Sequence, residues 1–178
     1  MTAQASPKLA LRPYLPADAR LVAEIYRASI EELTADDYSD AQRSLWAATA
    51  DDEAVFAARL AQELTLVATL GGSVVGFAAL KGADEIDFLY VHPAVAGQGI
   101  GAMLCDAVEK LAASRGTPRL LADASDSARG FFERRGYMAQ SRNTVSRGGE
   151  WLANTTMEKR LTPKGSTPKG NAPKGSTS

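Results

Sequence analysis

Apolar residues recur at helical spacing in the first third of the chain. After Pro16, the apolar side chains of Leu21, Val22, Ile25 and Tyr26 fall on successive turns of one helical face. Proline suits the first turn of a helix, because its missing N–H would have no partner there. The pattern therefore predicts an amphipathic helix that begins near Pro16.

Two further helices are expected before any strand. One covers residues 40–48, and the other runs from residue 51 or 52 to residue 62. The second of these presents Val55, Phe56 and Leu60 on one side, and the acids in its first turn suit the helix dipole. We therefore expect the opening third of the chain to be helical.

The pattern then changes to that of strands and alternating elements. Two β-rich runs, 64–70 and 73–80, flank Gly71-Gly72, a pair typical of a tight hairpin turn. The other expected elements are a strand at 85–91, a helix at 100–115, a strand at 119–124, a helix at 127–135, and a final hairpin of strands 141–146 and 151–158. This order predicts an α/β (α+β) fold with at least one strand–helix–strand crossover.

Composition indicates one ordinary domain with an unusual tail. The chain has 178 residues, 45% of them apolar, which suffices for a core, and no apolar run approaches the roughly 20 residues of a membrane-spanning helix. We expect a single domain over residues 1–161. Residues 162–178 form a basic, low-complexity Pro/Lys/Gly/Ser tail, which cannot bury a core and is expected to be flexible.

Charge and cysteine content exclude several classes of protein. Without the three lysines of the tail, 17 basic residues face 21 acidic ones, so no electrostatic argument favours nucleic acid or a membrane as a partner. A single cysteine, Cys105, excludes an internal disulfide, and with His92 as the only histidine we expect no metal site. The expected location is the reducing cytoplasm.

The most informative segment is EIDFLYVHPAVAGQGIGAML, residues 85–104, in which a strand leads through glycines into a helix. Glycines let main-chain amides approach an anion, and the helix N-terminus adds partial positive charge. This predicts a phosphate or pyrophosphate site, although the segment lacks the Gly-Lys-Ser/Thr ending of a P-loop. It also matches G-x-G-x-x-A, but the five residues before Gly97 and the short remaining chain argue against a dinucleotide fold.

The order of elements and two motifs resemble the GNAT superfamily of acyl-CoA-dependent N-acyltransferases over residues 9–161. V-H-P-A-V-A-G-Q-G-I-G at 91–101 is similar to the family's pyrophosphate loop, R/Q-x-x-G-x-G/A, and residues 125–137 are similar to its N-x-x-A-x-x-x-Y-E-x-x-G-F/Y. Within the superfamily the chain resembles the YafP-like branch. The shared patterns are Y-S-x-x-Q-x-x-x-W at 38–46, I-D-x-L-x-V at 86–91, D-A-S at 123–125 and G-E-W at 149–151.

The chain departs from the family pattern at three positions. Ala96 stands where the family has Arg or Gln, Ser125 where it has Asn, and Phe132 where it has Tyr. The first change removes a side-chain contact to pyrophosphate, which leaves the amides of residues 97–102 to bind it. The last removes the family's general acid from its usual place.

The resemblance implies a mixed, mostly antiparallel sheet whose central strands splay apart to admit acetyl-CoA. Backbone groups of residues 89–91 would pair with pantetheine, and a main-chain N–H would polarise the thioester carbonyl. The cofactor-binding residues implied in this way are Leu89, Tyr90, Val91, Gly97, Gln98, Gly99, Ile100, Gly101, Ala102, Ser125 and Phe132.

A base is needed to deprotonate the acceptor amine. Glu85 and Asp87 lie two positions apart on one strand and so share a face, and crowding two acids raises the pKa of one. Glu85 falls in the register of the histone-type members and Asp87 in that of the YafP-like pattern, and we prefer Asp87 slightly. The alternative is that one or both are solvated or structural acids.

Other candidates have competing interpretations. Asp123 either faces the cleft or caps the following helix. Tyr90 would replace the missing acid, although its strand parity, opposite to that of Asp87, favours the core. We expect His92 to serve the loop structure, and Cys105 to be no nucleophile because no second histidine is present to activate it.

The acceptor pocket is expected between the N-terminal helices and the last hairpin. The candidate residues there are Tyr38, Trp46 and Trp151, with Asp123 nearby. The aromatic side chains suit an apolar or aromatic amine, whereas the acids suit a cationic one, and both classes stay open.

These features predict an N-acetyltransferase that uses acetyl-CoA by direct attack in a ternary complex, as a monomer or homodimer. The alternative is a non-catalytic acyl-CoA sensor or interaction module, because Ala96 and Phe132 replace functional residues. A dinucleotide-dependent oxidoreductase is disfavoured by chain length.

Overall fold

A computed structural model describes residues 5–162 of the chain. Most of the basic tail, at 163–178, and residues 1–4 lie outside the described residues. In the described part the strands are β1 (Leu9–Pro13), β2 (Leu64–Leu70), β3 (Ser73–Lys81), β4 (Glu85–Val91), β5 (Arg119–Ser125), β6 (Met138–Arg147) and β7 (Glu150–Arg160). The α-helices are α1 (Ala19–Leu33), α2 (Asp40–Ala47), α3 (Glu53–Gln62), α4 (Ile100–Ser114) and α5 (Asp126–Arg134).

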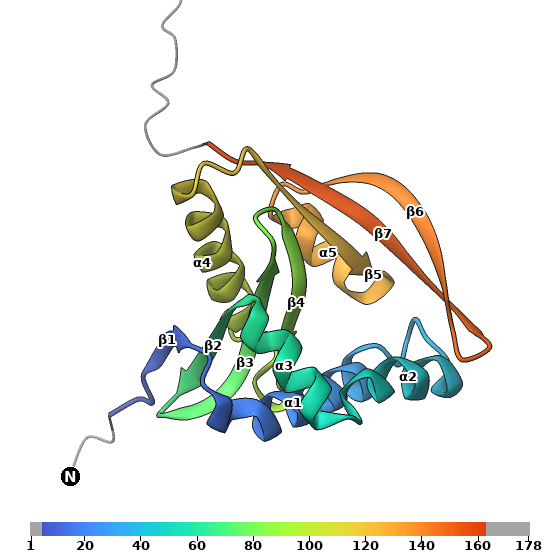
Figure 1. Cartoon of the computed structure of the whole chain (residues 1–178), viewed down its shortest axis with the longest axis horizontal. Helices are drawn as coiled ribbons and strands as arrows, with labels where there is room; N and C mark the ends of the chain where they lie inside the picture. Colours follow the sequence, from blue (N-terminus) through green and yellow to red (C-terminus); the bar gives the residue numbers. More distant parts are fainter. Residues whose placement is uncertain (1–4, 163–178) are drawn as a thin grey trace, which may run out of the picture.

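The seven strands form one sheet in the order β1-β2-β3-β4-β5-β7-β6 (Figure 1). Neighbouring strands are antiparallel except β4 and β5, which run parallel and are connected through α4. The expected mixed, mostly antiparallel sheet is therefore confirmed. The hairpin at Gly71-Gly72 is confirmed too, and both glycines have the positive φ that such a turn requires.

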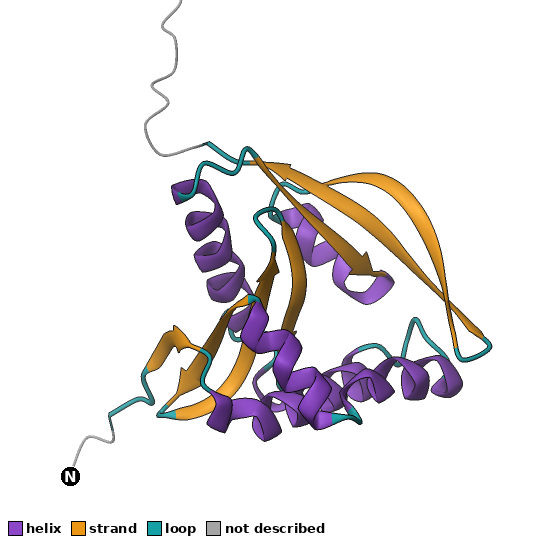
Figure 2. Cartoon of the chain, in the orientation of Figure 1, coloured by secondary structure: helices purple, strands orange, loops and turns teal. Residues whose placement is uncertain are grey.

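Helices cover both faces of this sheet (Figure 2). On one face, α1, α2 and α3 pack against β2, β3 and β4 around Tyr26, Phe56, Phe77 and Phe88. On the other face, α4 and α5 pack against β3, β4, β5 and β7. The sheet thus separates two apolar layers, and any ligand that reaches its centre must enter where neighbouring strands part.

The opening third differs from expectation in detail. Residues 9–13 form an edge strand that pairs with β2, so this part of the chain is not wholly helical. A five-residue strand between prolines has too few positions to show a clear period. Val55 and Leu21, expected on buried helical faces, are exposed instead, because each helix buries a narrower stripe than its apolar residues suggest.

The sheet opens in the middle, as the resemblance implied. β4 and β5 pair only at Glu85 with Leu121 and at Ile86 with Ala122. Beyond these pairs, β5 continues along β7 to Ser125, while β4 diverges from it (Figure 1). The C-terminal half of β4 therefore has no strand partner on its β5 side.

A bulge distorts β4 at the same point. Leu80 of β3 pairs with Ile86 and Ala79 pairs with Phe88, which leaves Asp87 without a partner residue. A bulge places one extra residue in a strand and changes the face to which the following side chains point. This irregularity determines which side chains meet in the opening between β4 and β5.

Candidate active site

A cavity of about 250 Å³ lies between the diverging ends of β4 and β5. Its walls come from both strands, from α1 and from α5, and include Leu89, Tyr90, Val91, Ala124, Phe131 and Phe132. Gly101, at the start of α4, closes one end. We call this space the strand cavity; it leads from the glycine loop toward the centre of the sheet.

A second cavity of about 220 Å³ lies on the side of α1, α2, α3 and the β6–β7 hairpin. We call it the hairpin cavity. The two cavities share six lining residues: Trp46, Ile86, Asp87, Tyr90, Asp123 and Ser125. The two cavities therefore adjoin at these residues, which we call the junction.

The glycine loop is shaped to bind an anion. Gly97 and Gly99 have φ values of 77° and 82°, and a Cβ at either position would meet nothing within 4 Å. Glycine is thus needed there for backbone conformation rather than for space. The first amides of α4, from Ile100 to Ala102, have no partner within the helix and point to the same side as the positive end of its dipole.

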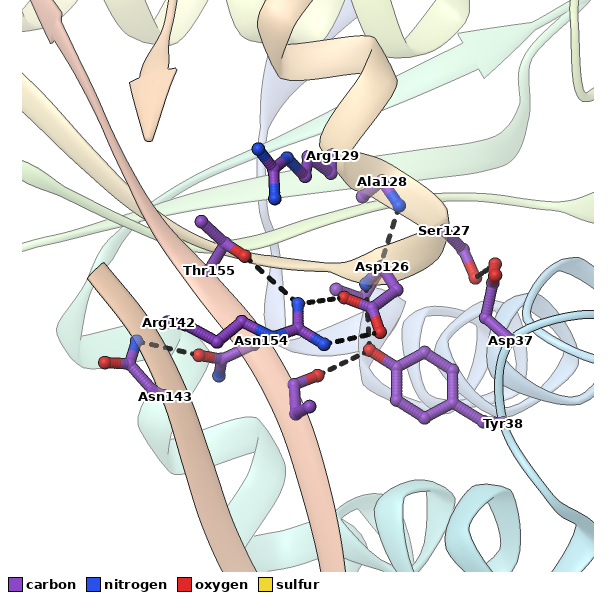
Figure 3. Close-up of polar contacts among 12 residues, drawn as sticks. Asp37, Tyr38, Asp126, Ser127, Ala128, Arg129, Arg142, Asn143, Asn154 and Thr155 are labelled. Atoms are coloured by element: carbon purple, nitrogen blue, oxygen red, sulfur yellow. Dashed lines mark hydrogen bonds and ion pairs between the residues drawn. The ribbon is translucent and has the colours of Figure 1, made fainter. Parts of the chain in front are cut away.

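The N-terminus of α5 is held in place by a network of side chains (Figure 3). The Tyr38 hydroxyl accepts a hydrogen bond from the Asp126 amide at 2.8 Å and donates one to the Ala153 carbonyl at 2.7 Å. Arg142 of β6 forms a two-point ion pair with the Asp126 carboxylate. These contacts connect the α1–α2 loop, α5 and β7, and so determine the shape of the junction.

Asp87 belongs to a group of three charges. The Arg59 side chain donates to Asp87 Oδ2 from Nε at 2.9 Å and from Nη2 at 2.5 Å. Glu63 lies beyond Arg59, with Oε1 3.6 Å from Arg59 Nε, and its Oε2 is buried with no hydrogen-bond partner among the described residues. Burial, reinforced by the adjacent Asp87 carboxylate, raises the pKa of Glu63 to about 7, although Arg59 opposes the shift.

Glu85 is the freer of the two predicted bases. Its side chain is 39% exposed and lines the hairpin cavity, and its nearest ion-pair partner is Lys81 at 3.9 Å. By contrast, the Asp87 side chain is only 10% exposed and both bonds from Arg59 end on one of its oxygens. The second carboxyl in the group around Asp87 and Arg59 is Glu63.

Tyr90 packs against the core as expected, beside Tyr26, Phe77 and Phe88. The expectation that Tyr90 and Asp87 point to opposite faces assumed a regular strand, but the bulge at Asp87 shifts the alternation, and Phe88 and Tyr90 pack on the same face of the sheet as Arg59. Tyr90 consequently lines both cavities together with Asp87. Burial raises the pKa of Tyr90 well above its usual value, so its hydroxyl stays protonated at neutral pH.

Asp123 does not cap α5. The cap is Ser125, whose Oγ accepts from the Ala128 amide at 3.1 Å, because Ser125 immediately precedes the helix. Asp123 Oδ1 accepts instead from the Thr156 hydroxyl at 2.6 Å, and Asp123 lies at the junction. Of its two predicted roles, the structure supports the one in the cleft.

The predicted acceptor residues do not all converge. Tyr38 and Trp46 pack edge to face and line the hairpin cavity. Trp151 does not line either cavity: its side chain is 63% exposed, and only its carbonyl is engaged, by Gln42 Nε2. The β6–β7 hairpin does line the hairpin cavity, but through Val145, Arg147 and Leu152.

Two further candidates have structural roles. The His92 Nδ1 accepts from the Ala94 amide, which shapes the start of the glycine loop. Cys105 is buried in α4, and burial beside Glu109 raises its pKa to about 11, so the thiol stays protonated at neutral pH.

Sequence reasoning missed three charged residues of the hairpin cavity and its surroundings. These are Arg59, Glu63 and Arg147. Arg59 and Glu63 lie four positions apart at the end of α3, which was a signal for an ion pair, but no spacing in the sequence connects them to Asp87. Arg147 precedes a glycine turn, where charged residues are ordinary.

No helix among residues 5–162 is long and apolar enough to cross a membrane. In the same part of the chain, no three His, Cys, Asp or Glu side chains gather closely enough to hold a metal ion. The candidate site consists of two adjoining cavities, the amides of the glycine loop, and a junction with two carboxylates and a tyrosine.

Comparisons with known proteins agree with this geometry. The family model described as Acetyltransferase (GNAT) domain matches residues 34–161. The chain is 29% identical over 147 residues to the N-acetyltransferase YafP of Escherichia coli, a match that spans 83% of this chain and 93% of that protein. The likeness to the YafP-like branch is thus confirmed.

Solved structures show the same fold. A GCN5-related N-acetyltransferase from Rhodopseudomonas palustris is 60% identical, with a TM-score of 0.84, over 90% of this chain and 99% of that one. The PaiA N-acetyltransferase from Thermoplasma acidophilum, solved in complex with coenzyme A, is 18% identical with a TM-score of 0.72, over 86% and 99% of the two chains. At that identity the second likeness shows the fold alone.

Proposed function

Because the chain belongs to the GNAT family of acetyltransferases, we propose that it transfers the acetyl group of acetyl-CoA to a primary amine of a small molecule or peptide. The observation that carries this proposal is the meeting of two cavities at a junction beside the glycine loop. A two-substrate reaction by direct attack needs two binding spaces that meet at one point. The carboxylates and the tyrosine at the junction favour catalysis over the sensor alternative.

The strand cavity suits the donor. In our proposal, the amides of Gly97 to Ala102 bind the pyrophosphate, since Ala96 supplies no side chain for it. Pantetheine then lies along the unpaired side of β4 at residues 89–91, where backbone groups have no strand partner on the β5 side. The PaiA structure, which has the same fold, was solved in complex with coenzyme A, which supports a coenzyme A thioester as the donor.

The junction suits the chemistry. The acceptor's ammonium group gives a proton to a carboxylate, directly or through water, and the free amine attacks the thioester carbon. A C–N bond forms, the C–S bond breaks, and a main-chain N–H of β4 stabilises the oxyanion. The Tyr90 hydroxyl, which stays protonated, donates a hydrogen bond to the departing sulfur, and the thiolate takes up the second proton, which the attacking nitrogen loses as the amide forms.

Glu85, which lines the hairpin cavity beside the junction, serves as the base through water in this scheme, because Arg59 already engages Asp87. Asp87 then acts by holding Arg59 and shaping the bulge of β4. Tyr38, Trp46 and Asp123 contact the acceptor, whereas Trp151 lies too far out to do so unless the hairpin moves.

The proposal also covers the cellular location, the extent of the domain and the oligomeric state. The single, buried cysteine is compatible with a reducing cytoplasm. Residues 1–161 would form one catalytic domain, as a monomer or homodimer.

The test is a thermal-shift titration with acetyl-CoA, CoA and NADPH, followed by an assay of thiol release with a panel of amines. A ligand that binds only the native state raises the melting temperature, so we expect shifts with the first two compounds alone. Release of thiol that depends on an added amine supports the proposal. A shift without release from any amine would instead indicate an acyl-CoA sensor, and no shift would remove the basis of both.

A further inference from the structure

The charges that line the hairpin cavity are unevenly distributed. Three carboxylates, Glu85, Asp87 and Asp123, lie on β4 and β5, and two arginines, Arg59 and Arg147, lie on α3 and the β6–β7 hairpin. The charge of Arg59 is neutralised by Asp87. The charge of Arg147 has no such partner: within residues 5–162, no carboxylate oxygen lies within 4 Å of its guanidinium nitrogens.

The guanidinium of Arg147 is exposed and contacts one hydroxyl group. Arg147 Nη1 donates to the Thr49 hydroxyl at 2.8 Å, which holds the hairpin against the turn after α2. Tyr26 and Tyr90 also line the cavity, and the Tyr26 hydroxyl lies 3.3 Å from the Trp46 carbonyl.

The cavity thus carries groups of both charges. The carboxylates lie at or beside the junction, where the reacting ammonium must lie. Arg147, on the β6–β7 hairpin, has guanidinium donors that no carboxylate of the described residues engages, and such donors recognise a carboxylate. A cavity of about 220 Å³ admits only a small molecule or a single side chain.

From this geometry we propose that the acceptor is a small amine that also carries a carboxylate, and that Arg147 binds that carboxylate. This inference rests on the proposed acetyl transfer and specifies its substrate class. The acids Glu85 and Asp123 attract the ammonium of such a molecule, and the guanidinium of Arg147 binds its carboxylate. A cationic diamine or an unsubstituted amine would leave Arg147 unpaired.

The test uses amines that differ only in the carboxylate. Thiol release at saturating acetyl-CoA is measured for L-phenylalanine against phenethylamine, for 4-aminobutyrate against propylamine, and for a short lysine peptide with blocked ends. We expect kcat/KM to be about tenfold or more higher for at least one carboxylate-bearing member than for its partner. Arg147→Gln should lower that value about 10- to 100-fold and leave the partner amine within about threefold, as expected for the loss of a charge-assisted contact.

A matched control separates charge from structure. Thr49→Val removes the hydrogen bond that holds the hairpin but keeps the charge of Arg147. If Arg147 acts by binding the carboxylate, Thr49→Val retains the preference for the carboxylate-bearing amine and Arg147→Lys retains part of it. If Thr49→Val loses the preference as completely as Arg147→Gln, Arg147 serves only to hold the hairpin, and the proposal is wrong.

A second measurement reports binding without catalysis. It is the further rise in the melting temperature of the CoA-bound protein when L-phenylalanine or 4-aminobutyrate is added. A shift that disappears in Arg147→Gln, without thiol release from any amine, retains the carboxylate site and rejects acetyl transfer. Thiol release that is equal for both members of each pair, or that occurs only with the lysine peptide, rejects the carboxylate site and retains acetyl transfer. Absence of any dependence on Arg147 in both readouts also rejects the carboxylate site.

Discussion

The raised pKa of Glu63 predicts how stability changes with pH. In the unfolded chain this carboxyl loses its proton near the ordinary value of 4.5, whereas in the folded protein it keeps the proton until about pH 7. Between these values the native state binds more protons than the unfolded state. The free energy of unfolding must therefore fall as pH rises through this window, and the contribution is fully present only below about pH 4.5.

The magnitude follows from the surroundings of the side chain. A single group changes stability by at most ~1.4 kcal/mol per pH unit while one state is protonated and the other is not. The Glu63 side chain is only 9% exposed, so solvent screens it little, but Arg59 is 42% exposed and Asp87 shares the local charge. We therefore expect the free energy of unfolding to fall by roughly 2 kcal/mol between pH 5 and 7.5, which is less than the full pKa shift of this one carboxyl would give.

The perturbation that isolates this effect is Glu63→Gln. Glutamine keeps the shape and buries no charge at any pH, so its free energy of unfolding lacks this contribution. The variant minus wild-type difference should rise by about 2 kcal/mol from pH 5 to 7.5. Urea denaturation at half-unit pH steps measures it, since all other titrations cancel in the difference.

Glu24→Gln is the matched control, because Glu24 lies on the surface of α1 and pairs with Arg20, which is itself 80% exposed. Its difference from wild type should stay within ~0.5 kcal/mol across the range. If the Glu63→Gln difference is flat as well, the carboxyl is not held neutral by burial. If it falls with pH, the ion pair with Arg59 outweighs desolvation, and the reasoning is refuted.

Three further predictions concern the junction, the loop and the base. Tyr38→Phe removes two partly buried hydrogen bonds and should lower the free energy of unfolding by about 2 kcal/mol. Its control, Tyr14→Phe, removes a buried hydroxyl that has no partner among the described residues, and should cost at most ~0.5 kcal/mol. Equal losses of the two variants in urea denaturation would contradict a stabilising role of the Tyr38 network. Gly99→Ala and Gly82→Ala each place alanine at positive φ in open space and should cost about 1 kcal/mol, but only the former should reduce the thermal shift with acetyl-CoA. Glu85→Gln should lower kcat about 10²- to 10³-fold and leave the acetyl-CoA dissociation constant unchanged; full activity would exclude Glu85 as the base.

Much of the fold was readable from the sequence because its signals are local. The helix that ends at Gln62 begins after Asp52, whose side chain accepts from the Val55 amide three residues later. The turn at Gly71-Gly72 needs only a positive φ at two adjacent residues. Such features depend on residues a few positions apart, so periodicity and turn chemistry predicted them correctly, whereas the five-residue β1 was too short to show a period.

The candidate site was only partly readable, because its contacts join distant segments. The glycine loop was found from its own spacing, since a strand, three glycines and a helix are contiguous. Parity placed Tyr90 in the core, where the structure has it, but it did not predict that Tyr90 lines both cavities together with Asp87. That arrangement follows from the bulge at Asp87, which depends on how β4 pairs with β3.

The sequence by itself therefore determined most of the elements and their order, the glycine loop before α4 and the likeness to a family of acetyltransferases. Only the tertiary structure decided that Arg59 and Glu63 surround Asp87, that Asp123 meets Thr156, and that Arg147 reaches Thr49 across 98 positions of the chain. The physical reason is that a charge is paired or left unpaired by packing, not by spacing. That pairing distinguishes the free carboxylate from the engaged one and leaves one arginine facing the second cavity.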